Sequence, residues 1–555
     1  MPITNVASRT ISPRLFSGHW SIVLILTVAA ILRFQNITQP FIDVYAWREA
    51  SVAMMAENFY RRNWNILYPE VNWVGPGPGY QGREFQTVSY ISALLYTFLG
   101  QHDWIGRSVS VLFGVLGIFA TYQLTRRVWN EHSAIAAAAL MAVLPGVVRL
   151  ERSFLPDPAM VALIVTSFWM LLVYLQNDKP LYLIIAVVVG VWGVLTKISG
   201  MIVGLPLIYT IVSIYDRRAS LSAEKIAKLG LVGILSALPV AAYYLWARHL
   251  AHSYPPNHFA GEGNWLWDQG LMQWIEQGYF ISDLWGPLWR LWSAPVILLA
   301  CFGMFLPFLL KKNDPETKSR ITHASRLSLA PWLFHWWMAA GVVFYLIGAR
   351  ELVGNSSNFH ILTPAVAALS ANAIIYISSF TAKQLKRPAL PMVIVVLIIV
   401  VIGIREWHYT RFYSTYAKQS YQLGLAMKAL SREDDLVITL GDVIGCPVAI
   451  YYSGRRGWLF PPFGEIKDEE RLPNETEAIA TFERLRAKGA KWFGVVNRWR
   501  NDIWKERPKF AQYIEKNCEL IKVGQAATIC RIQSQDEHTA NPFARAKSRL
   551  MVEGW

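Results

Sequence analysis

Residues 41–84 read FIDVYAWREASVAMMAENFYRRNWNILYPEVNWVGPGPGYQGRE, a polar stretch between two apolar segments. The sequence on both sides of it is hydrophobic enough to enter a bilayer. Asp43 follows the end of the first apolar run by a few residues. An acidic side chain at the mouth of a membrane protein is costly unless water, a cation or a substrate lies beside it. We therefore expect this stretch, with Asp43, to form the working face of a membrane protein.

The composition indicates a polytopic α-helical membrane protein. Of the 555 residues, 54% are hydrophobic and 16% are charged, whereas soluble domains carry about 25% charged residues. The 24 Trp and 24 Tyr suit two aromatic belts at the membrane interfaces. The net charge of +15 does not indicate a nucleic-acid partner, because much of the Lys and Arg falls in short loops where it meets lipid head groups.

The hydropathy pattern predicts about 11 transmembrane helices within residues 1–404, with external loop 37–87 carrying Asp43. The predicted spans are Trp20–Ile31, Val109–Leu124, Ala134–Val148, Met160–Leu175, Leu181–Leu195, Met201–Ile214, Leu229–Trp246, Leu291–Leu310, Leu329–Ile347, Ile361–Ser379 and Pro391–Ile404. Fifteen Lys or Arg then fall in inner loops, which places the N-terminus in the cytoplasm and the C-terminus outside the inner membrane.

Shorter segments outside the membrane are also expected. Trp47–Arg61 has the spacing of an amphipathic helix, and Val88–Leu99 is too short to span. The glycines and prolines of Val74–Gly82 predict a flexible surface loop. Arg149–Pro158 is expected to be an external segment, and Arg248–Trp289 to lie in the head-group layer as juxtamembrane helices.

After residue 404 the composition changes to that of a small extracytoplasmic α/β domain, residues 405–532, followed by a basic mobile tail, 533–555. The expected helices are Tyr421–Leu430, Glu475–Ala487 and Lys509–Asn517, and the expected strands are Asp435–Leu440, Trp492–Val496, Cys518–Ile521 and Ala527–Ile532. Cys518 and Cys530 flank an apparent hairpin, where a disulfide and a pair of thiols are both open readings.

Polar residues recur at the ends of the predicted helices on the outer side. They are Asp43, Arg152, Asp157, Lys197, Asn358 and His360. Charges of both signs at one face suggest an anionic ligand and a base. Each residue also has a plainer interpretation: Asp157 as a helix cap, Lys197 as a snorkelling side chain and His360 as a hydrogen-bonded histidine. For Trp47 and Arg48 that interpretation is interfacial anchoring.

The order of these motifs resembles that of the GT-C membrane glycosyltransferases, and among them family 39, the protein O-mannosyltransferases and lipid A aminoarabinose transferases. The resemblance covers roughly residues 20–375. It rests on Asp43 after the first helix, the Arg152–Asp157 spacing, Thr196-Lys197 at a helix end, and HILTPAVAAL at residues 360–369. The segments WREASVAMMAENFYRRNWNILYP and GYQGREFQ resemble a bacterial branch of the family.

The chain departs from the family pattern at three positions. Val44 stands where the family often has Glu, Gln86 stands where Pro is expected, and His360 stands where Arg is common. None of these departures removes the key carboxylate.

The resemblance implies a GT-C fold and an inverting transfer from a sugar on a polyprenyl phosphate to a lipid, glycan or protein acceptor. Asp43 would be the general base, and Arg152, Lys197 and His360 would bind the leaving phosphate. Asp157 would orient Arg152 or the acceptor. The acceptor or an ion would be bound by Trp47, Arg48 and Glu84.

No cofactor is certain from the sequence, and a divalent metal stays open. A transporter or flippase for a lipid-linked sugar is the alternative function, and a membrane scaffold is a third. A transporter usually has internal repeats and helices broken at the midplane, and no obvious repeat is present. There is also no convincing nucleotide-sugar motif in the sequence.

Overall fold

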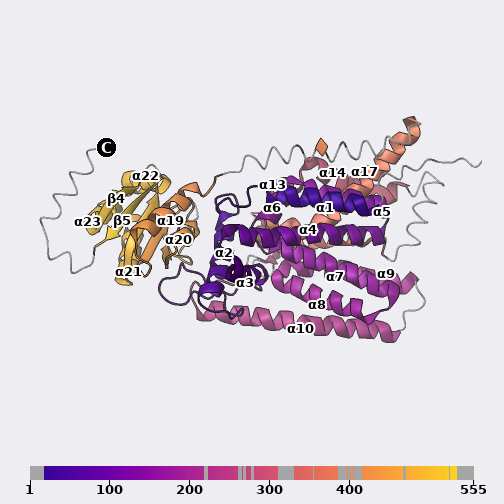
Figure 1. Ribbon diagram of the computed structural model, residues 1–555, viewed down its shortest axis with the longest axis horizontal. Coiled ribbons are helices and arrows are strands. Elements are labelled where there is room, and N and C mark those ends of the chain that lie inside the picture. The colour runs from indigo at the N-terminus through magenta and orange to yellow at the C-terminus, as the bar shows by residue number, and fades with distance from the viewer. Residues whose placement is uncertain are drawn as a thin grey trace, which may run out of the picture.

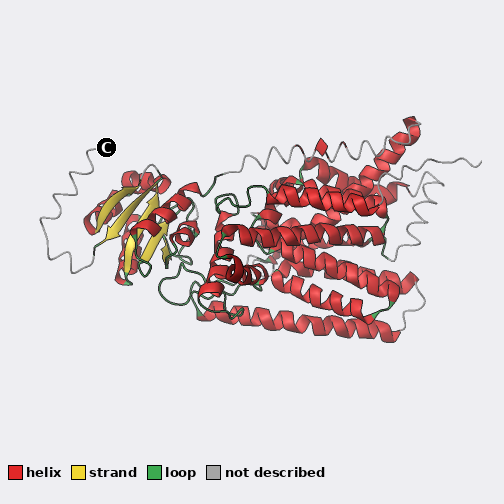
Figure 2. Ribbon diagram, viewed as in Figure 1, coloured by secondary structure: helices red, strands yellow, loops and turns green. Residues whose placement is uncertain are grey.

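The computed structural model describes residues 18–217, 223–259, 265–266, 270–276, 281–310, 330–353, 355–385, 415–466, 471–523 and 526–533, with single residues at 397, 400, 401 and 404. It has a bundle of long helices at one end and an α/β part at the other, with helices α2 (Ala46–Arg61) and α3 (Thr87–Leu99) between them (Figure 1). The strands all lie in the α/β part (Figure 2). The predicted mobile tail falls outside the described residues from 534 onward.

The bundle contains a helix for each of the first ten predicted spans. Its elements are α1 (Gly18–Phe34), α4 (Asp103–Val128), α5 (Glu131–Val143), α6 (Pro145–Arg152), α7 (Asp157–Asn177), α8 (Pro180–Thr196), η1 (Ile198–Val203), α9 (Gly204–Arg217), α10 (Ala223–Ser253), α12 (Leu271–Glu276), α13 (Ile281–Trp292), α14 (Ala294–Leu310), α16 (Leu333–Val353), η2 (Ser356–Leu362) and α17 (Thr363–Leu385). The eleventh predicted span, Pro391–Ile404, and the loop 311–329 lie largely or wholly outside the described residues.

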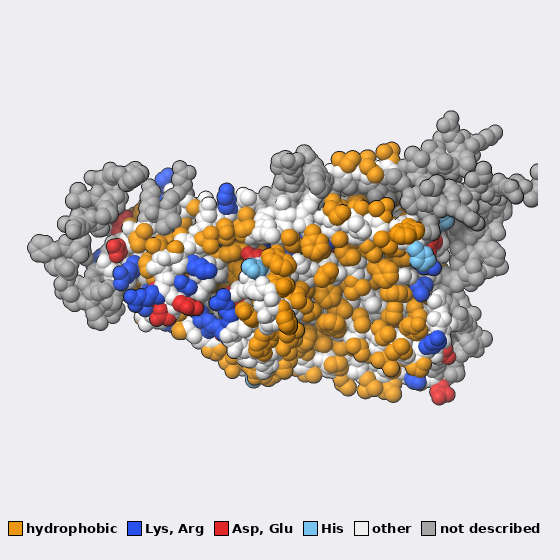
Figure 3. Space-filling model, in the orientation of Figure 1, with side chains coloured by type: hydrophobic (Ala, Val, Ile, Leu, Met, Phe, Trp, Pro, Cys, Tyr) orange, Lys and Arg blue, Asp and Glu red, His pale blue; other side chains and the backbone are white. Residues whose placement is uncertain are grey.

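The apolar helices differ in how they meet their surroundings. Among the described residues, four helices are long and apolar enough to cross a membrane, and two bent pairs could each add a span. In α7, 83% of the apolar window is buried, whereas in α10 only 11% is. Apolar side chains cover the visible face of the bundle (Figure 3). A face of this kind suits lipid contact, and the chain is a multi-pass membrane protein. The count of 11 spans and the direction of insertion stay predictions.

Helix α7 lies at the centre because it packs between α4 and α8. On another side of the bundle, α5 packs on α17 through short side chains, AIAAAAL in the first and AVAALSANA in the second. In a membrane the hydrophobic effect does not drive helices together, so they associate by close packing. Alanine and serine allow the helix axes to approach closely.

One predicted span differs from expectation, and the segment after it is buried in the protein. Ala134–Val148 was expected to cross as one helix, but α5 and α6 bend by 66° at Pro145, which has no N–H to continue the helix. Arg149–Pro158 contains the end of α6, a turn and the start of α7, and Glu151 and Arg152 are each only 1% exposed; its position on the external side stays a prediction. The cost of burying these charges is met by partners described below.

The C-terminal part holds a five-stranded sheet in the order β2-β1-β3-β5-β4. Its elements are α19 (Lys418–Leu430), β1 (Leu436–Leu440), α20 (Val448–Ser453), β2 (Gly457–Leu459), α21 (Glu475–Ala487), β3 (Ala490–Val496), α22 (Asn497–Glu506), α23 (Pro508–Asn517), β4 (Cys518–Val523) and β5 (Ala527–Ile532). Strand β1 pairs in parallel with β2 and β3, and β5 pairs antiparallel with β3 and β4.

All seven expected helices and strands of this part are present, and a disulfide joins Cys518 to Cys530 across the β4–β5 hairpin. Disulfides persist in oxidising compartments, which agrees with the predicted extracytoplasmic location. Three short elements, α20, β2 and α22, were not predicted. The sequence of α20, VAIYYS, is too short to show a helical period.

The loop 37–87 and the sheet share one hydrophobic core. Helices α2 (Ala46–Arg61) and α3 (Thr87–Leu99) belong to the same buried cluster as the side chains of the sheet. Tyr451 and Tyr452 of α20 donate to the two carboxylate oxygens of Asp103, at 2.8 and 2.6 Å. The predicted boundary at 404/405 therefore divides the chain but not the core.

Residues Val74–Gly82, the Gly-Pro segment, are held by backbone contacts to other parts of the chain. As expected, it forms no regular helix or strand, but a β-bridge joins Val74 to Trp458 and another joins Gly82 to Phe259. Gly75 and Gly457 are linked by a backbone hydrogen bond of 2.7 Å. Only the tip, residues 76–78, is exposed. The prediction of a loop at the surface thus holds for its tip alone.

Candidate active site

Asp43 lies at the start of α2, and its side chain is only 2% exposed. Its Oδ1 accepts a hydrogen bond of 3.1 Å from the backbone N–H of Tyr45, and its carbonyl accepts one of 3.0 Å from Ala46. A side chain that hydrogen-bonds the backbone two residues later fixes a local turn. The carboxylate therefore has a defined position at the end of the bundle that faces the sheet.

A buried arginine–glutamate pair surrounds that position. Arg107 of α4 donates through Nε and Nη2 to the two oxygens of Glu49, at 2.9 and 3.2 Å, and both side chains are fully buried. Its Nη2 lies 3.9 Å from Oδ2 of Asp43. The guanidinium also stacks on the ring of Phe41, 4.9 Å from its centroid.

Arg107 also holds the chain that leads to Asp43. It donates to the carbonyl of Gln39, and at 3.3 Å to the carbonyl of Pro40. Glu49 accepts the backbone N–H of Phe154 at 3.0 Å. Burial raises the pKa of Glu49 to about 7, against the opposing effect of Arg107. Because Arg107 opposes this rise, the pKa of Glu49 would be higher still without it.

Asp157 and Lys197 form a second pair, between α7 and the end of α8. Lys197 Nζ lies 2.6 Å from Asp157 Oδ1 and donates at 3.0 Å to Oδ1 of Asn358. Asp157 is the first residue of α7, where Pro156 is the N-cap, and its second oxygen, Oδ2, accepts no hydrogen bond within the described part of the chain. Lys197 is 5% exposed and points inward. The capping and snorkelling interpretations of these residues are therefore wrong, and the structure joins them as a pair.

A pocket opens beside this pair. It is lined by Trp47, Arg48, Ser51, Val52, Met55, Arg83, Glu84, Phe85, Gln86, Val88, Ser89, Leu155, Pro156 and Lys197. Four of the residues singled out in the sequence are among them. Three cations and one carboxylate line the pocket, so it carries an excess of positive charge. A cavity with apolar walls and convergent polar groups is the usual form of a ligand site.

The two arginines of the pocket come from different segments. Arg48 of α2 donates to Oγ of Ser357 at 3.0 Å. Arg83 donates to Oε1 of Gln81 at 2.6 Å, and its guanidinium lies 5.8 Å from the ring centroid of Trp47. Burial lowers the pKa of Arg83 to about 10, which leaves it charged at neutral pH.

Two predicted phosphate ligands lie outside the lining of the pocket. Arg152 donates through Nη2 to the carbonyl of Asn36 at 3.1 Å. His360 is fully buried, with Nε2 at 3.2 Å from Glu151 and Nδ1 at 3.1 Å from Oγ1 of Thr363. For His360 the hydrogen-bonded interpretation thus describes its surroundings.

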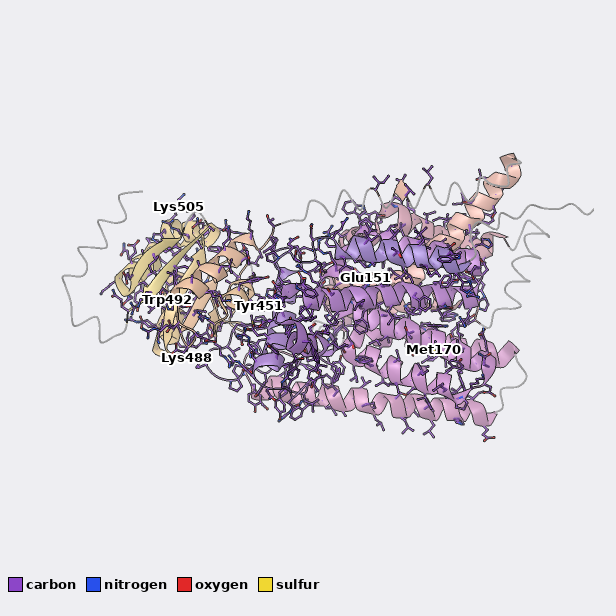
Figure 4. The ribbon with its side chains drawn as sticks, viewed as in Figure 1. Glu151, Met170, Tyr451, Lys488, Trp492 and Lys505 are labelled. Carbon is purple, nitrogen blue, oxygen red and sulfur yellow. A yellow bond between two sulfur atoms is a disulfide. The ribbon has the colours of Figure 1, made fainter. Side chains whose placement is uncertain are left out.

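Glu151 is the centre of a third buried network, inside the bundle (Figure 4). Arg33 of α1 donates to it through Nε at 2.7 Å and to the carbonyl of Ala142 at 3.0 Å. The network therefore ties α1, α5, α6 and η2 together.

Sequence reasoning missed Arg33, Glu49, Arg83, Arg107 and Glu151 as parts of the site. The signal was present for Arg33 and Arg107, because each stands close to or within an apolar run, where a charge must be paired. Their partners could not be chosen from sequence alone, since Arg33 and Glu151 are 118 residues apart and Arg107 and Glu49 are 58 apart.

Among the described residues, no group of three or more His, Cys, Asp or Glu side chains is arranged to hold a metal ion.

Part of the chain is similar in sequence to proteins named as mannosyltransferases. Residues 87–244 match the family described as dolichyl-phosphate-mannose-protein mannosyltransferase. The chain is 28% identical over 231 residues to YkcB of Bacillus subtilis (strain 168), which is named for a mannosyltransferase activity. That match covers 40% of this chain and only 29% of YkcB.

Solved structures of low identity share the fold. The oligosaccharyltransferase of Archaeoglobus fulgidus, solved with Zn and sulfate, has a TM-score of 0.58 at 15% identity, covering 93% of this chain and 73% of its own. ArnT of Cupriavidus metallidurans in the apo state has a TM-score of 0.58 at 13% identity, covering 92% and 97%. ArnT bound to undecaprenyl phosphate gives 0.57 at 12% identity, covering 93% and 98%.

These matches define the class of protein. The chain has the GT-C fold of membrane glycosyltransferases, with an α/β part against one end of its bundle. Within that class, the family match and the fold confirm the resemblance to glycosyltransferases of family 39.

Proposed function

We propose that the chain is an inverting glycosyltransferase that moves a sugar from a polyprenyl-phosphate donor to an envelope acceptor at the outer face of the cytoplasmic membrane. The observation that carries the proposal is the pocket, where Arg48, Arg83 and Lys197 converge at the end of the bundle that also holds the buried carboxylates Asp43 and Asp157.

Asp43 is the general base of the proposed reaction. Its carboxylate takes the proton of the acceptor's hydroxyl or amine, and the freed lone pair forms a bond to the anomeric carbon. The bond from that carbon to the phosphate oxygen breaks, and the polyprenyl phosphate leaves with the electron pair. A carboxylate in this role contributes about 10²–10⁴-fold to the rate.

The pocket cations stabilise the leaving phosphate. Lys197 keeps its predicted role, and the lining of the pocket supports Arg48 and Arg83 beside it. Fixed cations aimed at a developing charge are worth most where water is excluded. Because Arg152 and His360 are turned toward Asn36 and Glu151, we assign them the positioning of their helices in place of direct phosphate contact.

Asp157 fixes Lys197 for that task. A lysine on a flexible stem loses rotamer freedom when it binds a ligand, and the contact of 2.6 Å with Asp157 orients it in advance. Glu84 lies on the wall of the same pocket, where it would contact the acceptor or an ion.

The test is transfer from a labelled polyprenyl-phosphate sugar by the full chain in membranes, comparing wild type with Asp43→Asn. We expect a loss of about 10²–10⁴-fold. Asp434→Asn, an exposed carboxylate of the C-terminal part, is the matched control and should transfer normally. Equal transfer by Asp43→Asn in a normally inserted protein would refute the role of Asp43.

A transporter of lipid-linked sugars is the second candidate. Bent helix pairs favour it, because α5–α6 breaks by 66° and α13–α14 by 98°, and transporters use broken helices at their binding sites. A flipping assay in proteoliposomes separates the two functions: movement of the intact lipid-linked sugar without transfer would replace the glycosyltransferase proposal.

A further inference from the structure

The wall of the pocket continues into a cluster of aromatic rings that come from distant segments. Trp47 of α2 lines the pocket, and its ring centroid lies 6.4 Å from that of Phe463, in the turn after β2. The ring of His258, after α10, meets Phe463 edge-on at 5.7 Å. Trp73, just before the Gly-Pro segment, is buried, and its ring centroid lies 6.4 Å from that of Trp47.

This cluster is held in place and is partly exposed. Trp47 donates its indole N–H to the carbonyl of Gly445 at 2.7 Å, which fixes the ring against the C-terminal part. Trp47, His258 and Phe463 are each half-buried, and Gly464 and Glu465 next to Phe463 are exposed. Each of the three rings therefore keeps part of its surface open to a ligand.

His258 brings hydrogen-bonding capacity to the cluster. Within the described part of the chain, its imidazole makes no hydrogen bond. The positive charge of Arg83, together with burial and Arg48, lowers the pKa of His258 to about 3. The ring is therefore neutral at neutral pH, with one nitrogen that donates and one that accepts.

The combination matches a sugar ring. A pyranose has an apolar C–H face that stacks on an aromatic ring and a rim of hydroxyl groups that both donate and accept. We propose that Trp47, Phe463 and His258 form a subsite for a sugar ring of the acceptor, and that the acceptor is therefore a saccharide. This inference rests on the proposed function and names its substrate class.

A peptide acceptor fits this region less well. Peptides in extended form bind by adding a strand to a free sheet edge. Strand β2 is the edge strand beside the Gly-Pro segment. The backbone of its Gly457 already hydrogen-bonds to Asn72 and Gly75 of the same chain, at 3.0 and 2.7 Å. The edge nearest the site is thus occupied.

The experiment uses the full chain in lipid nanodiscs with labelled polyprenyl-phosphate sugar, and offers methyl β-maltoside, a Ser/Thr peptide, or water alone. Saturation-transfer NMR reports binding of the maltoside independently of turnover. In wild type we expect saturation of the maltoside ring protons and sugar transfer to the maltoside. We expect Phe463→Ala and His258→Ala to raise its KM about 5- to 20-fold, with donor KM and donor hydrolysis unchanged.

Trp504→Ala is the matched control, because Trp504 is an aromatic residue of the same C-terminal part that hydrogen-bonds Glu515 on α23. Transfer to the peptide but not the maltoside, or an unchanged maltoside KM in both variants, would overturn the saccharide subsite while leaving the glycosyltransferase intact. Absence of both transfer and donor hydrolysis in wild type would overturn the proposed function, and the subsite with it.

Discussion

Two groups of charges lie at the same end of the bundle and are balanced in opposite ways. Around Asp43, the guanidinium of Arg107 meets the carboxylate of Glu49 in a fully buried pair. In the pocket, Arg48 and Arg83 have neutral hydrogen-bond partners, Ser357 and Gln81. One group is matched within the protein and the other carries surplus positive charge.

The difference distinguishes a charge pair that fixes the geometry of the site from a pocket that binds an anion. A buried matched pair adds little net stability over an apolar pair, but removing one partner is costly; such a pair fixes geometry. Surplus cations in a pocket repel one another and gain most when an anion arrives. The Arg107–Glu49 pair is therefore a positioning device for Asp43, and the pocket is the place for a phosphate.

The largest expected effect comes from breaking the matched group. Arg107→Met leaves Glu49 buried without its cation and releases the carbonyls of Gln39 and Pro40. We expect the free energy of unfolding to fall by about 3–5 kcal/mol, measured by denaturant unfolding of the full chain in detergent. Arg126→Met is the control: its partner is Glu131 and its side chain is 47% exposed, so the loss should stay below about 1 kcal/mol. Similar losses in both variants would contradict the distinction.

The Lys197–Asp157 pair connects the two groups, since Lys197 lines the pocket and is yet neutralised. A double-mutant cycle with Lys197→Met and Asp157→Asn should give a coupling free energy of about 1–3 kcal/mol in unfolding. Donor KM should rise in both single variants. Additive effects on stability would show that the pair is not coupled.

Much of this end of the molecule could be predicted, because a charge in an apolar sequence is conspicuous. Asp43, Asp157 and Lys197 were singled out for that reason, and the last two form one pair. The seven helices and strands of the C-terminal part were also predicted, since periodicity is a local property.

What could not be predicted depends on distant contacts. From the sequence, Glu49 is expected on the exposed face of an amphipathic helix. In the structure it is paired with Arg107, which is 58 residues later in the chain. Arg83 reads as a loop charge until the bridge of Gly82 to Phe259 folds it over the pocket. The bend at Pro145 directs α6 inward, and Glu151 and Arg152 at its end are buried. Single-sequence periodicity contains none of these pairings.

The surplus charge itself is tested by Arg48→Gln and Arg83→Gln. Each change keeps a hydrogen-bonding side chain and removes one positive charge. A hydrogen bond to a charged group is worth about 1.5–3 kcal/mol, so donor KM should rise about 10- to 100-fold while the unfolding free energy changes little. The effect should shrink as salt is raised. An unchanged donor KM would exclude these arginines from phosphate binding.

The smallest expected effect is a shift in the pKa of His258, and it measures the surplus positive charge of the pocket most directly. His258 carries a pKa lowered to about 3, first by Arg83 and then by burial, compared with about 6.5 in an unfolded chain. The unfolded state then binds the proton more readily, so stability is full above pH 6.5 and is lost as the pH falls toward 3. In Arg83→Gln the pKa of His258 should move upward and this loss in acid should weaken. Histidine-selective NMR titration, assigned with His258→Gln, reports the shift. If the pKa of His258 stays near 3 in the variant, burial alone keeps the ring neutral, and the pocket's charge is balanced by groups other than those that line it.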